Sequence, residues 1–323
     1  MPIVSRLDSP GSFHHVMSHC VEGCHALKED RFKADMLDRL STAVGKNLLK
    51  IHAWALMSNH FHLLAEPVES TLSVAMQKIL TGFACSYNSK CDRRGHVFDA
   101  RFRSILVEQE SYYLKLISYI HLNPLKAGVV ASLQELSIYP WTGHSTITGA
   151  CRSPWMSLDT TQAMLGAHGR DWRSEYMSLL VANHGIDDKE METGNFSIGR
   201  QGLKKVTGED LVPTGRSILV LGSRSFALSQ YEKYRDLRRA GIRNRRDQHR
   251  KMDEATVRIA LEQGISPSTM RSGGRGERLS EARRKLIVEL LTYHGVTQGE
   301  AASYLNISTS AVSHMLNKRK TDS

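Results

Sequence analysis

The first half of the chain switches between short apolar runs and apolar residues at helical spacing. The segments "FHHVMSHC" (13–20) and "LLKIHAWAL" (48–56) are short runs of β-branched and apolar residues, which predict strands. Between them, "ALKEDRFKADMLDRLSTAVGKN" carries apolar residues at helical spacing and ends in a Gly-Lys-Asn stop signal, which predicts a helix. The chain is therefore expected to open with a strand, a helix and a second strand.

The same alternation continues to Pro124. "HFHLLAE" predicts a strand, and "TLSVAMQKILTGFACSYNSK" predicts a helix beginning near Ser70 or Thr71. "HVFDARFRSILVEQE" is partly a strand, and the helix "SYYLKLISYIHLNP" is expected to stop at Pro124, because proline does not continue a helix interior. Strands mixed with helices over about 130 residues predict an α+β fold with helices packed on one sheet.

The pattern weakens after this point, and residues 146–250 are expected to form a mostly helical or irregular bridging region. "WRSEYMSLLVANHG" predicts a helix ending in glycine, whereas "KKVTGEDLVPTGRSILVLGS" has the composition of a loop. The basic stretch 233–251, "KYRDLRRAGIRNRRDQHRK", is either a solvated helix face or a phosphate-contacting segment. Its position in the sequence does not decide between the two.

Residues 251–323 predict a helical DNA-binding module with a helix-turn-helix at 297–317. A first helix, "TQGEAASYL", and a turn at Asn306 and Ile307 lead to a recognition helix capped by Ser308. Short helical modules of this kind also pack against protein partners, and the basic composition favours DNA. The residues expected to face base edges and phosphates are Ser308, Thr309, Ser310, Ser313, His314 and Lys318, with Arg319 and Lys320 adding charge.

Composition agrees with a polyanionic partner. The chain has 323 residues, which suggests two domains, and its formal net charge of +10 attracts nucleic acid. Five cysteines, an odd number without a secretory segment, predict a reducing cytoplasm, and no apolar stretch approaches the length of a membrane span. Cys20, Cys24 and His25 resemble half of a zinc site, but no second cysteine pair follows at ligand spacing.

The segment "MSNHFHLLAEP" contains a predicted apolar strand that is interrupted by two histidines. On a strand, residues two apart point to the same face, so His60 and His62 present two imidazoles side by side. This geometry fits two ligands of one divalent cation, although a hydrogen-bonded surface pair has the same spacing. Two imidazoles leave most coordination positions open, which suits polarisation of a phosphate better than structural zinc.

The helix before Pro124 offers the remaining chemistry. Tyr119 and Asn123 lie four residues apart and therefore share one helical face. The Asn123 amide oxygen is a candidate metal ligand, and the Tyr119 phenol is a candidate nucleophile once a polarised phosphate lies beside it. The alternative for Tyr119 alone is an ordinary core tyrosine.

Four blocks of the sequence resemble a known family. "HAWALMSNHFHLL", "GHVFDARFRSILVE", "YLKLISYIHLNPLKAGVV" and "YPWTGHS" resemble, in the same order, the blocks of single-tyrosine transposases of the His-hydrophobic-His (HUH) endonuclease superfamily. Within it, they are similar to the REP-associated tyrosine transposases and their insertion-sequence-200-like relatives. The resemblance covers roughly residues 5–145. The chain departs from many relatives at Ser58, where they carry proline, and in "SHCVEGCH", where they carry an Asn- and Arg-rich turn.

The resemblance implies a ferredoxin-like antiparallel sheet with helices on its face, forming a catalytic domain over residues 1–145. It implies cleavage of single-stranded DNA at a hairpin through a covalent 5′-phosphotyrosine, with a free 3′-hydroxyl that later rejoins strands. Carried over by residue, His60 and His62 match the metal-binding pair, Tyr119 the nucleophile, and Asn123 the position that completes the metal site. The metal in this family is Mg²⁺ or Mn²⁺.

The resemblance also suggests where single-stranded DNA runs. Arg93, Arg94, Arg101 and Arg103 lie between the two catalytic elements, where phosphates must pass. The rings of His96, Phe98 and Phe102 are candidates for stacking on bases, and the two phenylalanines are equally suited to the core.

The expected partners are hairpin DNA and, through the helix-turn-helix, duplex DNA, in a bacterial nucleoid-associated protein that is a monomer or a homodimer. Two alternatives remain: a DNA-binding regulator that does not cut, and a metallohydrolase that uses activated water.

Overall fold

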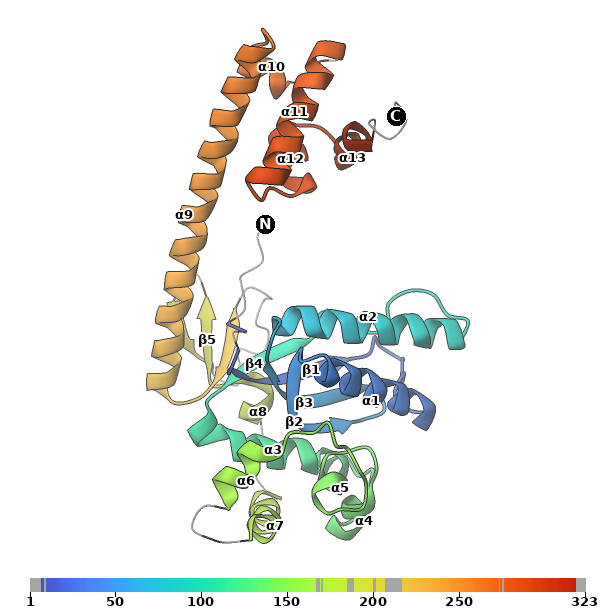
Figure 1. Cartoon of the computed structure of the whole chain (residues 1–323). Helices are drawn as coiled ribbons and strands as arrows, with labels where there is room; N and C mark the ends of the chain where they lie inside the picture. Colours follow the sequence, from blue (N-terminus) through green and yellow to red (C-terminus); the bar gives the residue numbers. More distant parts are fainter. Residues whose placement is uncertain are drawn as a thin grey trace. The chain divides into compact units, whose positions relative to one another are not determined.

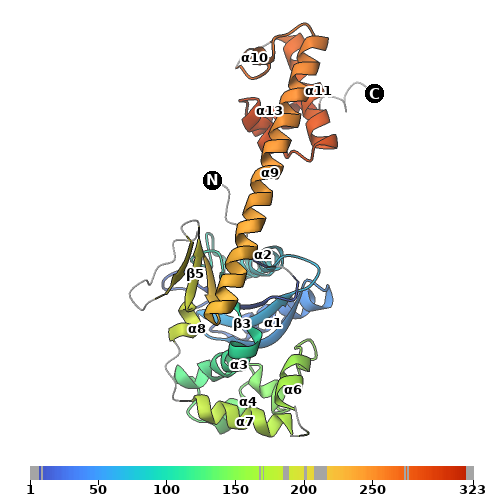
Figure 2. The same ribbon diagram turned by 90° about the vertical axis from the view of Figure 1, so that its left-hand side faces the viewer.

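The computed structural model describes residues 7–8, 10–166, 169, 171–184, 189–199, 202–206, 217–272, 274 and 276–317. The chain divides into two compact units, an N-terminal unit of residues 1–234 and a C-terminal unit of residues 235–323. Figure 1 and Figure 2 show the elements of each unit in two views. None of the described helices is long and apolar enough to cross a membrane.

The N-terminal unit is an α+β fold around a seven-stranded mixed sheet with the strand order β2-β3-β1-β4-β7-β5-β6. Strands β2, β3, β1 and β4 pair antiparallel in that order, whereas β7 pairs parallel with β4. The strands are β1 (Phe13–His19), β2 (Leu49–Leu56), β3 (His60–Pro67), β4 (Arg103–Val107), β5 (Phe196–Gly199), β6 (Gly202–Lys205) and β7 (Ile218–Leu221).

Helices cover both faces of the first four strands (Figure 1). Helices α1 and α2 pack against each other and lie on one face, and α3 lies on the other, against β1, β2 and β3. The helices of this unit are α1 (Asp30–Gly45), α2 (Leu72–Lys90), α3 (Gln109–Lys126), α4 (Leu133–Ile138), α5 (His144–Ile147), α6 (Asp159–Leu165), α7 (Trp172–Asn183) and α8 (Lys189–Thr193).

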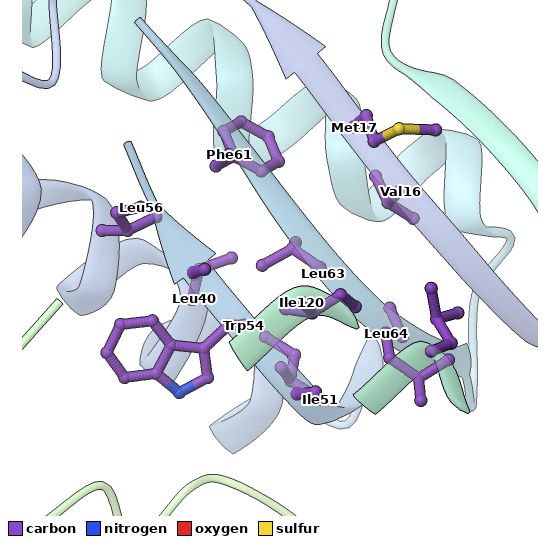
Figure 3. Close-up of a cluster of buried hydrophobic side chains, with 14 of the residues drawn as sticks. Val16, Met17, Leu40, Ile51, Trp54, Leu56, Phe61, Leu63, Leu64 and Ile120 are labelled. Atoms are coloured by element: carbon purple, nitrogen blue, oxygen red, sulfur yellow. The ribbon is translucent and has the colours of Figure 1, made fainter. Parts of the chain in front are cut away.

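Strands β1, β2 and β3 are buried on both sides because each of their faces packs against helices. Figure 3 shows part of the core, with Trp54, Phe61 and Leu63 of the sheet and Ile120 of α3 labelled. All four side chains are at most 1% exposed. The core fixes the register of the strands, because a slip by one residue would exchange the two faces of each strand.

Several expected elements are confirmed. Helix α2 begins at Leu72 after Thr71, whose side chain accepts a hydrogen bond from the Val74 N–H as an N-cap. Helix α7 covers the expected segment, from Trp172 to Asn183.

The stop at Pro124 is wrong: α3 continues through it to Lys126. A proline removes only its own N–H, and here it lies in the last turn, where the helix can continue for two more residues.

Residues 146–250 differ from the expected bridging region. The segment predicted as a loop begins within β6 and contains the whole of β7, and together with β5 these strands extend the sheet beyond β4. Strand β7 is four apolar residues, all buried, so it shows no alternation that would mark it as a strand. Its parallel pairing with β4 brings together residues that are more than 100 positions apart, which local sequence patterns do not report.

The C-terminal unit is helical. Helix α9 (Arg224–Glu262) begins in the N-terminal unit and continues into this one, followed by α10 (Pro267–Met270), α11 (Glu277–Tyr293), α12 (Gln298–Tyr304) and α13 (Thr309–Asn317). Its core gathers apolar residues of α9 and α11 with Ala301, Ala302 and Val312.

The connection between α12 and α13 follows the expected boundaries. Thr297 and Glu300 form a capping box at the start of α12. Asn306 in the turn has a φ of 53°, a left-handed conformation that asparagine tolerates better than most residues. Ala301 and Ala302 are buried, and their small side chains let α12 pack closely against its neighbours.

Candidate active site

Four histidines from two neighbouring strands gather on the α3 face of the sheet. In the register of β1 and β3, His19 lies opposite His60 and Met17 lies opposite His62. The rings of His19 and His60 stack with centroids 4.8 Å apart, and those of His15 and His62 stack at 5.2 Å. His60 and His62 lie on the same face, as predicted, with ring centroids 5.1 Å apart.

A chain of hydrogen bonds assigns the proton of each ring. The Met191 carbonyl oxygen accepts from His15 Nδ1 at 2.8 Å, so His15 Nε2 carries a lone pair. His62 Nδ1 lies 3.0 Å from that Nε2 and must donate to it. The remaining nitrogen of His62, Nε2, therefore has a free lone pair. His60 reaches the same state, because its Nδ1 lies 2.8 Å from Asn59 Oδ1, an acceptor.

Burial keeps these rings neutral. Desolvation lowers the pKa of His15 to about 4. Burial and the neighbouring His19 lower the pKa of His60 to about 4. Burial, with His15 next, holds the pKa of His62 well below its ordinary value. At neutral pH the rings of His15, His60 and His62 are therefore imidazoles rather than imidazolium cations.

Tyr119 of α3 lies against these rings. Its ring centroid is 5.5 Å from that of His62 and 5.7 Å from that of His15, both edge-on. The side chain is 5% exposed, and its hydroxyl donates a 2.7 Å hydrogen bond to Glu192 Oε1. Burial, followed by the hydrogen bond to Glu192, raises the pKa of Tyr119 above its ordinary value, so the phenol is protonated at neutral pH.

Helix α8 brings Glu192 to this place. Two contacts fix the segment: the His15 bond to the Met191 carbonyl, and a bond from the Asn195 N–H to the Val220 carbonyl at 2.9 Å. Gly194 follows α8 with a φ of 70°, and a Cβ there would lie 2.8 Å from the Val220 carbonyl oxygen. The close approach to β7 requires glycine and aligns α8 with the histidines.

The donor atoms fit a divalent cation in their chemistry. His60 and His62 offer two unprotonated Nε2 atoms, and each ring is held by a bond at its other nitrogen, as metal-binding histidines usually are. The Asn123 Nδ2 donates to the Tyr119 carbonyl oxygen at 2.9 Å, which directs the lone pairs of its Oδ1 away from that bond. Among the described residues, no three His, Cys, Asp or Glu side chains converge as a metal site. A cation here would need ligands beyond these residue types, such as the Asn123 amide, water or a phosphate.

Arg103 of β4 lies on the same face as the histidines, because Met17 is paired with both Arg103 and His62. Its Nε and Nη2 atoms are buried and have no hydrogen-bond partner in the described part of the chain. Burial lowers the pKa of Arg103, and Glu192 opposes that effect. A buried guanidinium with unpaired N–H groups is costly unless an anion binds to it.

The other predicted arginines do not join this cluster. Arg93 donates to the His96 carbonyl at 3.0 Å and so holds its own loop, whereas Arg94 and Arg101 are exposed. Phe102 is 7% exposed and belongs to the core. Phe98 packs edge-on against Phe61, so both phenylalanines take the core alternative.

The predicted recognition helix is α13. Ser308 caps it by accepting a 3.1 Å bond from the Ala311 N–H, and Thr309, Ser310 and His314 are exposed. Ser313 was expected to face DNA, but its hydroxyl donates to Gln298 Oε1 of α12 at 3.0 Å. Lys318, Arg319 and Lys320 lie outside the described residues.

Sequence reasoning missed three residues of the site: His15, His19 and Glu192. The two histidines had a signal: they lie four residues apart on the strand "FHHVMSHC", an even spacing that puts both on one face, as the spacing of two does for His60 and His62. Glu192 had none, since it lies 73 residues from Tyr119 on a helix of five residues.

Comparison with known proteins does not establish a family for the chain. No family model matches it, and no curated protein matches it. A solved structure described as a REP-associated tyrosine transposase bound to a REP hairpin is similar in part. It shares 17% identity with this chain, the match covers 49% of this chain and 98% of that one, and the TM-score is 0.38.

Proposed function

We propose that this protein is a metal-dependent single-stranded DNA endonuclease and strand transferase that acts at hairpin DNA through a covalent 5′-phosphotyrosine. One observation carries the proposal: the Tyr119 ring packs edge-on against the ring of His62, whose Nε2 has a free lone pair. The phenol proposed as the nucleophile and the imidazoles proposed as metal ligands come from separate blocks of the resemblance, and their rings lie side by side.

The sheet order supports the ferredoxin-like part of the resemblance. The first four strands run β2-β3-β1-β4, with helices after β1 and β3, which is the strand order of a ferredoxin-like fold. We infer that β5, β6 and β7 are an extension that this chain adds to that sheet. The extension matters for function because α8, which carries Glu192, directly precedes β5.

Each side chain has a role in the proposed reaction. His60, His62 and Asn123 would hold Mg²⁺ or Mn²⁺, which when bound polarises the scissile phosphate. Arg103 would pair with a phosphate oxygen through the N–H groups that have no partner within the described chain.

Tyr119 must lose its proton as it attacks, because burial keeps the phenol neutral. Glu192 lies in hydrogen-bond contact with that hydroxyl and is placed to accept the proton. In the reverse step the same carboxyl group would return the proton to the departing phenolate.

The C-terminal unit would hold the stem of the hairpin. We propose that α12 and α13 form a helix-turn-helix that binds duplex DNA, and the exposure of Thr309, Ser310 and His314 on α13 supports this proposal. Cutting and holding would then belong to different units of the chain.

The test is formation of the covalent adduct. Wild type and Tyr119→Phe are incubated with a single-stranded hairpin oligonucleotide and Mg²⁺ or Mn²⁺, and the products are run on a denaturing gel. We expect a protein–DNA adduct from the wild type and none from the variant, because phenylalanine lacks the attacking oxygen. Cleavage that persists in Tyr119→Phe would support a metallohydrolase instead. Binding without cleavage by the wild type would support a non-cleaving regulator.

A further inference from the structure

The cations of α9 within the C-terminal unit fall into two groups. Towards the end of the helix they are paired: Arg250 with Asp247 at 2.7 Å, and Arg258 with Glu289 at 2.5 Å. Before that point most arginines have no ion pair within the part of the chain that the structure describes. These unpaired and exposed arginines are Arg235, Arg238, Arg243, Arg245 and Arg246.

Four of them share one side of the helix. At 100° per residue, Arg235, Arg238, Arg245 and Arg246 fall within one sector of α9, with Ile242 at its centre. We name these four side chains the arginine face. A groove lies along the C-terminal part of this face and is lined by Ile242, Arg245, Arg246, His249, Arg250, Asp253 and Glu254.

The carboxylates of this groove are already engaged. Asp253 accepts hydrogen bonds from Arg271 and from the Tyr304 hydroxyl, and Glu254 pairs with Arg250 at 2.8 Å. They therefore do little to neutralise the arginine face.

The positive charge of the whole chain is concentrated in the same unit. Residues 235–323 hold 18 of the 43 Lys and Arg residues but only 10 of the 33 Asp and Glu residues. Their net charge is thus +8 of the chain's +10.

The arginine face adjoins the helices proposed to bind DNA. Gln248 Nε2 donates to the His294 carbonyl at the end of α11, at 3.4 Å. The His249 ring lies 6.4 Å from that of Tyr304, the last residue of α12. The face therefore flanks the first helix of the proposed helix-turn-helix.

We propose that the arginine face binds the phosphate backbone of duplex DNA and extends the contact made by α12 and α13. This inference rests on the proposed binding of duplex DNA by the C-terminal unit. From Arg235 to Arg246 the helix rises about 17 Å, the length of about five base pairs. Long, flexible arginines suit phosphates, which carry no sequence information.

A membrane surface fits the same face less well. A helix that lies on a bilayer needs a broad apolar side, and this face has only Ile242, which is 39% exposed.

The test is the salt dependence of binding. Fluorescence anisotropy measures the affinity of the full-length protein for a labelled 20-base-pair duplex at several KCl concentrations. Each phosphate contact contributes about 0.9 to the slope of log K against log salt. We expect Arg245→Gln/Arg246→Gln to reduce the slope by about 2, so that the wild type loses about tenfold more affinity than the variant over a fourfold rise in salt.

A matched control removes the same charge from the same helix. Lys251 pairs with Asp247 and Arg258 with Glu289, so Lys251→Gln/Arg258→Gln should leave the slope nearly unchanged. Glutamine favours helices about as well as arginine, and circular dichroism checks that helix content is retained. An equal reduction of the slope in both variants would show a general charge effect and would overturn the proposal.

Sequence dependence separates this proposal from the one on which it rests. The arginine-face variant should weaken binding equally to random duplexes and to the duplex that the wild type selects from a random pool, whereas Thr309→Ala/Ser310→Ala should weaken binding only to the selected duplex. If the wild type binds no duplex, both proposals fail. If the wild type binds duplex and Arg245→Gln/Arg246→Gln has the same slope of log K against log salt, only the role of the arginine face in DNA binding is excluded. A protein partner for this face is then better supported.

Discussion

The chemistry of the site depends on the hydrogen bonds that hold each histidine ring and the Tyr119 hydroxyl. His62 has a free Nε2 because its Nδ1 donates to His15 Nε2. His15 Nε2 can accept because the proton of that ring is on Nδ1, which donates to the Met191 carbonyl oxygen. Tyr119 is held in the same way, by a carboxylate that comes from α8. A tyrosine that is neutral and buried is a poor nucleophile alone, so the partner of its hydroxyl decides whether it can react.

Glu192→Gln keeps the size of this side chain but removes its ability to take a proton. If Glu192 is the base, adduct formation should slow by about 100-fold, the lower end of the usual effect of a general base. A single-turnover time course on the denaturing gel measures the rate.

Glu190→Gln is the matched control, since it removes the same charge two residues earlier in α8. Its rate should stay close to that of the wild type. A faster adduct in Glu192→Gln would instead mean that Glu192 shields Tyr119 from the phosphate.

Helix α3 presents two chemically different sides. One carries Tyr119 towards the histidines, and the other carries His121 into a buried network. His121 Nδ1 and His144 Nδ1 lie 2.8 Å and 2.7 Å from the Tyr176 hydroxyl, which can donate to one ring and accept from the other. This network ties α3 to α5 and α7 and thereby fixes the helix that holds the proposed nucleophile.

Tyr176→Phe should destabilise the N-terminal unit by about 2 kcal/mol, because two buried imidazole nitrogens lose their partner. All four tryptophans of the chain lie in residues 1–234, so tryptophan fluorescence in a urea titration reports this unit. Tyr293→Phe serves as the control, since Tyr293 is 78% exposed. Equal stability of Tyr176→Phe and wild type would mean that the network does not hold α3.

The same network makes the unit sensitive to acid. Burial lowers the pKa of His144 to about 4, below the ordinary histidine value of 6.5. Between these values the unfolded chain binds a proton that the folded chain does not, so stability is complete above pH 6.5 and falls towards pH 4. His144 alone should cost on the order of 3 kcal/mol over this range.

The free energy of unfolding at pH 7, 6, 5 and 4.5, followed by tryptophan fluorescence, measures this effect. His144→Gln should make the profile less steep, since glutamine does not titrate, while the slope due to His15 and His60 remains. A wild-type profile that is level from pH 7 to 4.5 would contradict the argument.

The two units of the molecule differ in charge as well as in fold. Residues 1–234 hold 25 Lys and Arg residues against 23 Asp and Glu residues, whereas the C-terminal unit is strongly basic. The candidate active site lies wholly in the nearly neutral unit, and the duplex-binding surfaces proposed above lie wholly in the basic one. Affinity for DNA and cleavage of DNA should therefore be separable.

A chain ending at Tyr234 tests this separation. It should still form the Tyr119 adduct with single-stranded hairpin DNA, and its affinity for duplex should fall steeply because the C-terminal basic unit is gone. Adduct gels and anisotropy measure the two properties, and circular dichroism confirms folding. A folded truncated protein that forms no adduct would show that the C-terminal unit takes part in cleavage.

The sequence predicted correctly those elements that have a clear residue period or a helix cap. The shared face of His60 and His62 follows from the two-residue period of a strand, and the start of α2 follows from its Thr71 cap. The same strand period could have found His15 and His19. Elements without such signals were misjudged: β7 is too short and too uniformly apolar to show a period, and Pro124 looked like a stop although the helix ends two residues beyond it.

Residue type and short-range spacing suffice to predict that one strand offers two imidazoles, that one helix offers a phenol, and that the chain is strongly basic. Which of these groups lie together depends on the fold. Glu192 reaches Tyr119 because β7 pairs with β4 and α8 packs beside it, and His62 has its free lone pair because His15 lies across the sheet. Such contacts arise from packing between distant segments, and no local period of the chain encodes them.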